Sequence, residues 1–483
     1  MIFIDQTVVS VALPIIQRDL HISQSGLQWI VNAYVLALAS TVALGGKLGD
    51  SLGRVRAFIT GIVLFAIAST ICGFAPNESI LISARAFQGI AAGLMIPASA
   101  AIVVDSFDIY ERGKAMAIYV GVAQAFLAIG PLLGGALTEY LSWRWVFWIN
   151  IPVGIVAIVL TYISKPLQTI THKQHINISF ALMLIVGLVS LVFGIQQGHS
   201  FGWTSVLTLG LISAGLILLM LFGYLQTKSN KPLIQFKLFN DPAFTSDTIL
   251  LFCIQFAMIS IIVFGAIYLQ NILHFSPLEA GFALMPIIIS VVIMSQVSGH
   301  LLDRVGVRVP ALIGTALIAV GFLGQAPFLP RAEFLFVLPG MILLGLGIGL
   351  VMVATNTDAL NRAPSQYRAQ ASGVVQTIRQ MGATIGLACI GGLVSTMLAW
   401  RTDAIIANYA GEERVKTLLS QAELGQVDAI NDLMTNYPIV LDRFHFALSK
   451  SIADGYYFAG AVSVLAFFIA LFLMSSGKQH EDV

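Results

Sequence analysis

Long apolar stretches follow one another along almost the whole chain and leave little room for any other structure. Fourteen segments reach or approach the roughly 20 apolar residues that a helix needs to cross a bilayer. Only 10% of the 483 residues are charged, against roughly 25% in soluble domains, which excludes a water-soluble globule. We therefore expect an all-α integral membrane protein with fourteen transmembrane helices. Their expected limits are 2–16, 27–46, 55–74, 80–104, 115–137, 146–163, 178–197, 205–225, 245–270, 280–302, 309–328, 334–354, 371–400 and 452–475.

Lysine and arginine set the expected orientation, because loops rich in them stay in the cytoplasm. With the first residue inside, most Lys and Arg fall in inner loops and only three in short outer loops, so both termini are expected in the cytoplasm. No positively charged n-region or A-x-A site marks a signal peptide. The first stretch, from Asp5 to Gln17, covers only about 18 Å of a roughly 30 Å hydrocarbon core. We therefore expect further residues to precede Met1.

An internal repeat divides the chain into two similar parts. The pattern G-x-L-x-D-x-x-G at 46–53 returns 253 residues later at 299–306. The pattern G-V-x-Q followed by two spaced glycines, at 121–134, returns 252 residues later at 373–386. Two matches at nearly one offset predict two six-helix bundles with two helices inserted between them, an arrangement typical of transporters. The expected parts are a first half at 1–165, a linker with the inserted helices at 166–240, and a second half at 241–483 that carries an outer helical loop at about 401–451.

Composition excludes several other classes of protein. A net charge of +1 gives no basic surface for nucleic acid. The three cysteines are far apart in apolar stretches, so neither a disulfide framework nor a metal site is indicated, and no cofactor is expected. The chain has no P-loop, H-E-x-x-H or G-x-S-x-G motif, which argues against a pump or an enzyme. We expect a monomer that contacts membrane lipids and carries a small molecule.

Charged and polar residues inside the apolar stretches are the first candidates for function. A charge in the middle of the membrane costs about 2.5–3.5 kcal/mol on insertion scales, so we expect Asp5 and Arg85 to have a functional or structural role. Arg379 is a second deep positive charge, which would disfavour cations unless Asp247, Asp358 or Glu139 neutralised it. Helix-to-helix hydrogen bonding is the alternative role for such side chains. The expected lining of a substrate cavity is Asn32, Tyr34, Gln88, Gln124, Gln255, Gln376 and Arg379.

Several motifs, in order and at the expected spans, resemble the major facilitator superfamily and within it the fourteen-span drug:proton antiporters. The loop 46–56 is similar to the superfamily signature between spans two and three. Arg85-Ala86-Phe87-Gln88-Gly89 resembles the R-x-x-Q-G element of span four, and Gly130-Pro131-Leu132-Leu133-Gly134-Gly135 the G-P-x-x-G-G element of antiporters. The resemblance to the fourteen-span branch rests on 5–7 with 12–14, on 143–147 with Asn150 and Pro152, and on 379–382.

The resemblance implies roles for three groups of residues. Asp5 would take up and release the coupling proton, with Arg85 as its polar partner or relay; the alternatives are a helix cap at the membrane edge and a structural tie. The residues of the cytoplasmic gate would latch the two halves, although as solvated loop charges they would need no such role. Pro131 removes a backbone donor in mid-helix and would let that helix bend, although packing is the plain interpretation of the neighbouring glycines. The gate residues are Gly46, Asp50, Gly53, Arg54 and, in a weaker second copy, Asp303; the antiporter element is Gly130, Pro131, Gly134 and Gly135.

The function expected from the sequence is the export of drugs or other lipophilic or cationic compounds in exchange for protons by alternating access. The chain would lie in a plasma membrane, as bacterial members of the family do. The alternative is an exporter or symporter of a physiological solute such as a metabolite, a lipid or a siderophore. The G-P-x-x-G-G element argues against symport, by resemblance only.

Overall fold

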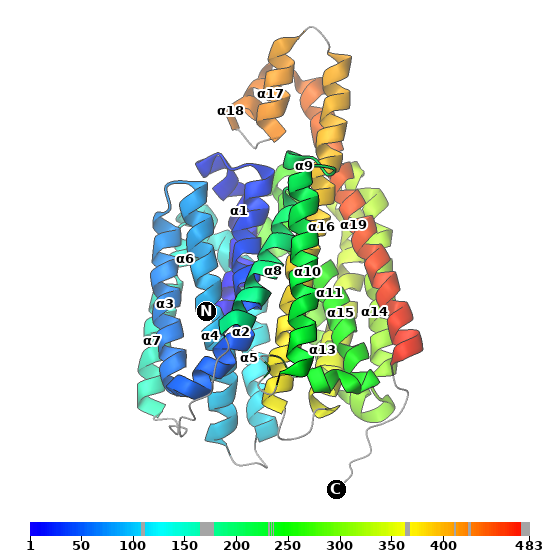
Figure 1. The fold of residues 1–483 in the computed structure, drawn as a ribbon. Coiled ribbons are helices and arrows are strands. Elements are labelled where there is room, and N and C mark those ends of the chain that lie inside the picture. The colour runs from blue at the N-terminus through cyan, green and yellow to red at the C-terminus, as the bar shows by residue number, and fades with distance from the viewer. Residues whose placement is uncertain are drawn as a thin grey trace.

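A computed structural model describes residues 1–107, 112–164, 178–229, 232, 234, 236–362, 368–409, 412–423 and 427–474. Within these ranges the chain is helical and contains no β-strand. Figure 1 shows the long helices standing side by side in one bundle. Twelve candidate membrane spans meet the length and hydropathy expected of a crossing helix.

The first half of the chain forms one side of this bundle, coloured blue to cyan in Figure 1. Its first helix carries three charged residues, Asp5, Arg18 and Asp19, and is not among the twelve candidate spans, although it packs against the fifth helix inside the bundle. The helices of this half are α1 (Ile2–Leu20), α2 (Gln24–Leu52), α3 (Arg54–Phe74), α4 (Glu78–Ser106), α5 (Arg112–Tyr140), α6 (Trp145–Trp148) and α7 (Asn150–Ser164).

A helical hairpin follows and lies against both halves. Its first helix, α8 (Ile178–Gln196), contacts α2 of the first half and α16 of the second. The short α9 (Gly198–Phe201) leads into α10 (Val206–Lys228), which packs along α8. Both α8 and α10 fall within 166–240, the segment in which the repeat predicts two inserted helices. In Figure 1 they lie between the helices of the first and the second half.

The second half forms the other side of the bundle, coloured green to red in Figure 1. The segment expected as one helix at 280–302 is broken near Leu284 because Pro286, at the start of the next helix, has no N–H to continue the ladder. The helices of this half are η1 (Phe236–Asn240), α11 (Pro242–Ile267), the single π-turn η2 (Tyr268–Ile272), α12 (Pro277–Ala283), α13 (Met285–Val305), α14 (Arg308–Gln325), η3 (Ala326–Arg331), α15 (Phe334–Arg362), α16 (Arg368–Asn408), α17 (Glu413–Glu423), α18 (Val427–Asn436) and α19 (Pro438–Leu473).

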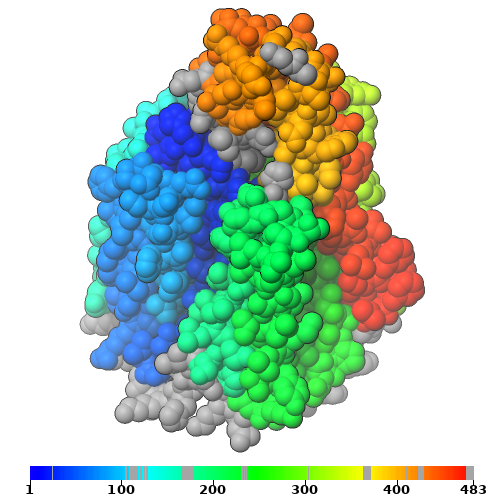
Figure 2. Space-filling model, turned by 45° about the horizontal axis from the view of Figure 1, so that its top comes forward, coloured from blue at the N-terminus to red at the C-terminus, as the bar shows by residue number. Residues whose placement is uncertain are grey.

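A small helical cap stands at one end of the bundle. The helix expected to end at Trp400 continues to Asn408, and the last helix begins at Pro438 rather than at Ile452. These extensions of α16 and α19 carry the amphipathic helices α17 and α18, whose apolar residues Val415, Leu419 and Leu433 are fully buried. Figure 2 shows the cap, in orange, above this end of the bundle.

The last glycine of the repeated loop motif has a positive φ in both halves. Gly53, between α2 and α3, has φ 94°, and Gly306, between α13 and α14, has φ 78°. A residue with a Cβ is strained at such angles, so the sharp helix-to-helix turn requires glycine in both copies. The two copies of the loop motif thus share a glycine turn between two helices.

Candidate functional site

Asp5 and Arg85 form an ion pair inside the first half. Asp5 lies on α1 and is 0% exposed, while Arg85 lies on α4 and is 1% exposed. Arg85 Nη1 is 2.5 Å from Asp5 Oδ2, and Arg85 Nε donates to the carbonyl of Ile30 on α2 at 3.1 Å. The pair balances two charges that could not be buried singly without a large desolvation penalty. Sequence reasoning brought these two residues together as candidates, and the structure places them in direct contact.

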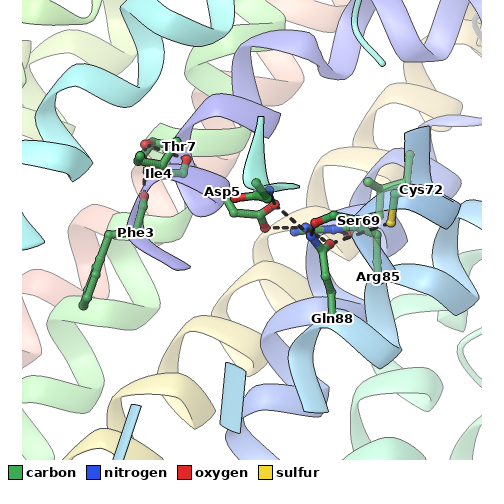
Figure 3. A network of polar contacts seen from close by, with 10 residues as sticks. Phe3, Ile4, Asp5, Thr7, Ser69, Cys72, Arg85 and Gln88 are labelled. Atoms are coloured by element: carbon green, nitrogen blue, oxygen red, sulfur yellow. Dashed lines mark hydrogen bonds and ion pairs between the residues drawn. The ribbon is translucent and has the colours of Figure 1, made fainter. Parts of the chain in front are cut away.

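Gln88 connects the ion pair to α3, and Asn150 connects it to α7. Its Nε2 donates to Asp5 Oδ1 at 3.1 Å and to Ser69 Oγ of α3 at 2.5 Å, while its Oε1 accepts from Arg85 Nη1 at 2.7 Å. Asn150, at the start of α7, donates from Nδ2 to Asp5 Oδ1 at 3.2 Å. Figure 3 shows Asp5, Arg85, Gln88 and Ser69 pointing toward one another from their separate helices. Asp5 therefore accepts from three side chains, and a proton on its carboxylate would change each of these contacts.

Tyr34 covers the ion pair from α2. The centre of its ring is 4.3 Å from Cζ of Arg85, a cation–π distance, and the side chain is fully buried. Among the described residues its hydroxyl has no hydrogen-bond partner. Ser69 and Asn150 complete the network, but sequence reasoning did not propose them as site residues. Asn150 could have been noticed as an amide in an otherwise apolar stretch, whereas one serine in a span gives no such signal.

The glycines of the antiporter element lie where α5 packs closely against α1 on one side and α12 on the other. A Cβ on Gly134 would lie 2.6 Å from the carbonyl oxygen of Val8 on α1. On the other side of α5, a Cβ on Gly281 of α12 would lie 2.6 Å from the carbonyl oxygen of Pro131. Such distances are shorter than real Cβ contacts, so both positions require glycine for the backbones to approach. The element thus joins α1 to α12 and connects the two halves.

The remaining cavity candidates do not lie together. Asn32 donates from Nδ2 to Gln196 Oε1 of the inserted α8 at 2.9 Å. Gln255 on α11 is half-buried, and its Oε1 has no partner among the described residues. Gln376 and Arg379, both half-buried, share α16. The side chain of Gln124 lies outside the described part of the chain.

The acids expected near Arg379 have other partners. Arg362 Nε lies 2.5 Å from Asp358 Oδ2 and 3.7 Å from Asp247 Oδ2. Glu139 Oε2 accepts from the backbone N–H of Leu278 at 2.9 Å. In the described ranges no carboxylate lies within ion-pair distance of Arg379, and its Nε has no hydrogen-bond partner.

The structure describes only part of the expected cytoplasmic gate. Gly46 lies near Pro97 of α4, Gly53 forms the turn after α2, and Arg54 begins α3. The side chains of Asp50 and Asp303 lie outside the described residues. The gate therefore stays a prediction.

Known proteins resemble the chain in both sequence and fold. Residues 1–387 match the family model of the Major Facilitator Superfamily. The chain is 32% identical to the multidrug resistance protein Stp of Mycobacterium tuberculosis (strain ATCC 25618 / H37Rv), over 83% of this chain and 74% of Stp. It is 29% identical to the tetracenomycin C resistance and export protein of Streptomyces glaucescens, over 98% and 89% of the two chains. The puromycin resistance protein pur8 of Streptomyces alboniger is 32% identical, over 85% of this chain and 81% of its own length.

Two solved structures show the same fold at low sequence identity. A bacterial homologue of the human lysosomal transporter Spinster, in an inward-facing and unoccupied conformation, superposes with a TM-score of 0.63 at 17% identity, over 98% of this chain and 94% of that one. A D-xylose-proton symporter superposes with a TM-score of 0.60 at 13% identity, over 98% and 95%. With helices that span the membrane many times and relatives that are transporters rather than enzymes, the chain belongs to the major facilitator superfamily.

Proposed function

We propose that this chain exports lipophilic compounds, cations among them, in exchange for protons by alternating access. The observation that carries this proposal is the buried Asp5–Arg85 pair with its shell of Gln88 and Asn150. A carboxylate held by several donors can exchange one of them for a proton, and the accompanying change in contacts is a means of coupling protonation to helix movement. Arg85 is the positive group that remains when Asp5 is neutral.

The relatives support the class of cargo. Proteins of similar sequence carry names that refer to multidrug resistance, tetracenomycin C export and puromycin resistance. Drugs of this kind are lipophilic, and a largely apolar bundle suits them. We therefore place the expected cargo among such compounds, and a physiological solute is the alternative that the experiment below would reveal.

We also propose a topology and a gate for this transporter. α1 and α5 cross the membrane together with the twelve candidate spans, which gives fourteen crossings with both termini in the cytoplasm of a bacterial cell. Residues 1–165 and 241–483 are the two moving halves, and 166–240 carries the inserted hairpin. The loop from Gly46 to Arg54 latches the halves on the cytoplasmic side, with Asp303 in the second copy, while Gly130 and Pro131 let α5 bend. The protein acts as a monomer.

The test is transport by the purified chain in proteoliposomes with an imposed pH gradient, with ethidium as the first probe. We expect ethidium movement that collapses when a protonophore is added and that is lost in Asp5→Asn. Asp403→Asn, an exposed aspartate on the extension of α16, is the matched control and should leave transport unchanged. Full transport by Asp5→Asn would remove Asp5 from the mechanism. If a broad panel of lipophilic dyes gives no transport, a physiological solute is the cargo.

A further inference from the structure

A polar stripe runs along one face of α16. Ser372, Gln376 and Arg379 follow one another at helical spacing. Ser372 is exposed, whereas Gln376 and Arg379 are half-buried and the Nε of Arg379 is enclosed. A Cβ on Gly373, beside this stripe, would meet no atom within 4 Å, so the described helices leave this face of α16 open near Gly373.

The other faces of α16 are tightly packed. Val374 and Val375 are buried in a cluster that includes residues of α2 and α8. Gly382 lies against the backbone of Phe252 on α11. At the end that bears the cap, Gln28 of α2 donates to the carbonyl of Gly391 at 3.3 Å. The helix thus lies at the seam between the two halves.

The stripe faces water rather than lipid. Arg379 lies about 17 Å along α16 from its first residue, at a rise of 1.5 Å per residue, which places it deep in the bilayer. A guanidinium and an amide turned toward lipid tails at that depth are strongly disfavoured, and such residues almost always face the bundle interior or a water-filled space. Because α16 packs on α2 of the first half and on α11 of the second, such a space would lie between the halves.

The charge on this stripe is positive and uncompensated within the described ranges. Asp5 is paired with Arg85, Asp358 and Asp247 surround Arg362, and Asp454 lies 2.6 Å from Arg401. Each of these four carboxylates thus lies within ion-pair distance of an arginine other than Arg379, Asp358 and Asp247 sharing Arg362. Arg379 has no carboxylate within that distance in the described ranges, and its Nε is without a hydrogen-bond partner there. On the adjacent α11, Gln255, about one turn beyond Phe252, has an unpartnered amide oxygen.

We propose that Arg379 binds a negatively charged group of the transported compound, so that amphiphilic anions such as carboxylates and phenolates are preferred over cations. The guanidinium offers several donors in a plane that matches a carboxylate. Gln376, one turn away on the same face, supplies a neutral donor and acceptor beside it. This inference rests on the proposed transport function for its biological meaning, but the binding preference itself does not depend on proton coupling.

Binding of two dyes of similar size and opposite charge tests the proposal. Fluorescein is anionic and rhodamine 6G cationic at pH 7.5, and fluorescence polarisation measures both with the purified full chain in detergent. We expect wild type to bind fluorescein more tightly. Arg379→Gln should weaken fluorescein binding at least about tenfold, the equivalent of about 1.4 kcal/mol, and leave rhodamine 6G binding unchanged or tighter. Arg379→Lys should retain most of the preference, and Arg331→Gln, at an exposed arginine, is the matched control.

Three outcomes would overturn the proposal: no binding of fluorescein to wild type, tighter binding of rhodamine 6G than of fluorescein, or equal fluorescein binding by wild type and a folded Arg379→Gln. If Arg379→Gln fails to fold, the relative affinity of the wild-type protein for the two dyes still tests the preference for anions.

Transport in proteoliposomes separates this inference from the function on which it rests. A monoanion leaving against one entering proton moves two elementary charges inward, and a dianion such as fluorescein at pH 7.5 moves three, whereas a monovalent cation leaving against one proton moves none. Fluorescein export should therefore respond to a membrane potential set with potassium and valinomycin. Charge-selective binding without proton-driven transport would support the role of Arg379 in anion binding and contradict the proposed proton antiport.

Discussion

Gln270 of the second half donates a hydrogen bond from Nε2 to the carbonyl oxygen of Val11 in the first half, at 2.7 Å. Gln270 is 3% exposed and lies in the single π-turn that ends α11. Val11 follows Ser10, whose carbonyl lacks a helical donor because Pro14, four residues later, has no N–H. The hydrogen bond thus lies beside an interrupted part of each helix, and it joins the halves near the end that bears the cap.

We predict that Gln270→Leu weakens the closure of this end. One net hydrogen bond contributes about 0.5–1.5 kcal/mol, so the ratio of open to closed molecules should rise roughly two- to twelvefold. Spin labels on Tyr140 of α5 and Phe282 of α12, both exposed, report the separation by pulsed electron resonance. A distance distribution identical to that of wild type would show that the bond does not hold the halves. Gln421→Leu, in the cap, is the control.

A second prediction concerns the contact of α5 with α1. Gly134→Ala would bring a methyl group against the backbone of Val8, and inserting a group into a packed contact costs about 1–3 kcal/mol. We expect a lower thermal midpoint in detergent and slower transport. Gly299→Ala makes the same change in α13, where no atom lies within 4 Å, and should leave both unchanged or raise stability slightly. Equal effects of the two variants would contradict the packing argument.

The helices and the repeat could be predicted from the sequence because both depend on local pattern. Periodic apolar segments, the glycine turn at Gly53 and its copy at Gly306 are all visible in the chain itself. The ends of α16 and α19 could not be placed, since hydropathy ends at the membrane surface whereas these helices continue beyond it. The sequence predicts an outer helical loop at about 401–451, but not that α16 and α19 themselves extend to carry it.

The candidate site was predictable only in its charged residues. Asp5 and Arg85 are conspicuous because a charge in an apolar stretch is costly. The roles of their neighbours depend on packing, because Asn150 reaches Asp5 from α7 whereas Ser69 of α3 contacts Gln88. The surroundings of Arg379 could not be predicted either. They depend on which acidic residues pair with other arginines, and only the folded structure shows those pairs.

A third prediction tests how the buried ion pair contributes to folding. Arg85→Gln leaves Asp5 buried beside neutral partners, and removal of one member of a buried pair costs about 3–5 kcal/mol. Asp5→Asn combined with Arg85→Gln removes both charges and should recover most of that loss. Thermal unfolding of the four proteins gives the coupling energy as a double-mutant cycle. Strictly additive effects would mean that the two side chains act independently.

A fourth prediction concerns the cap in acid. Arg414 Nη2 lies 2.9 Å from Asp432 Oδ2, and its hydrogen bond lowers the pKa of the Asp432 carboxyl below its usual value near 4. A carboxyl whose pKa is lowered by folding stabilises the fold above its unfolded pKa, and the contribution is lost as pH falls through the folded pKa. The protection factors of α17 and α18 in hydrogen exchange, which remove the pH dependence of the intrinsic exchange rate, should therefore be constant from pH 8 to 5 and decrease below about pH 4. Asp432→Asn should exchange faster already at pH 7, and identical profiles for the two proteins would exclude this pair as the cause.

The last prediction fixes the direction of the bundle in the membrane. Ser420, exposed on α17, and Thr227, exposed at the end of α10, lie at opposite ends of the bundle (Figure 1). In a background without Cys72, Cys253 and Cys389, a charged thiol reagent should label Ser420→Cys in intact cells. Thr227→Cys should react only after the cells are made permeable, because positively charged loops such as the one that follows α10 stay in the cytoplasm. The reverse pattern would invert the topology, and with it the side on which Gln270 and Val11 close the path between the halves.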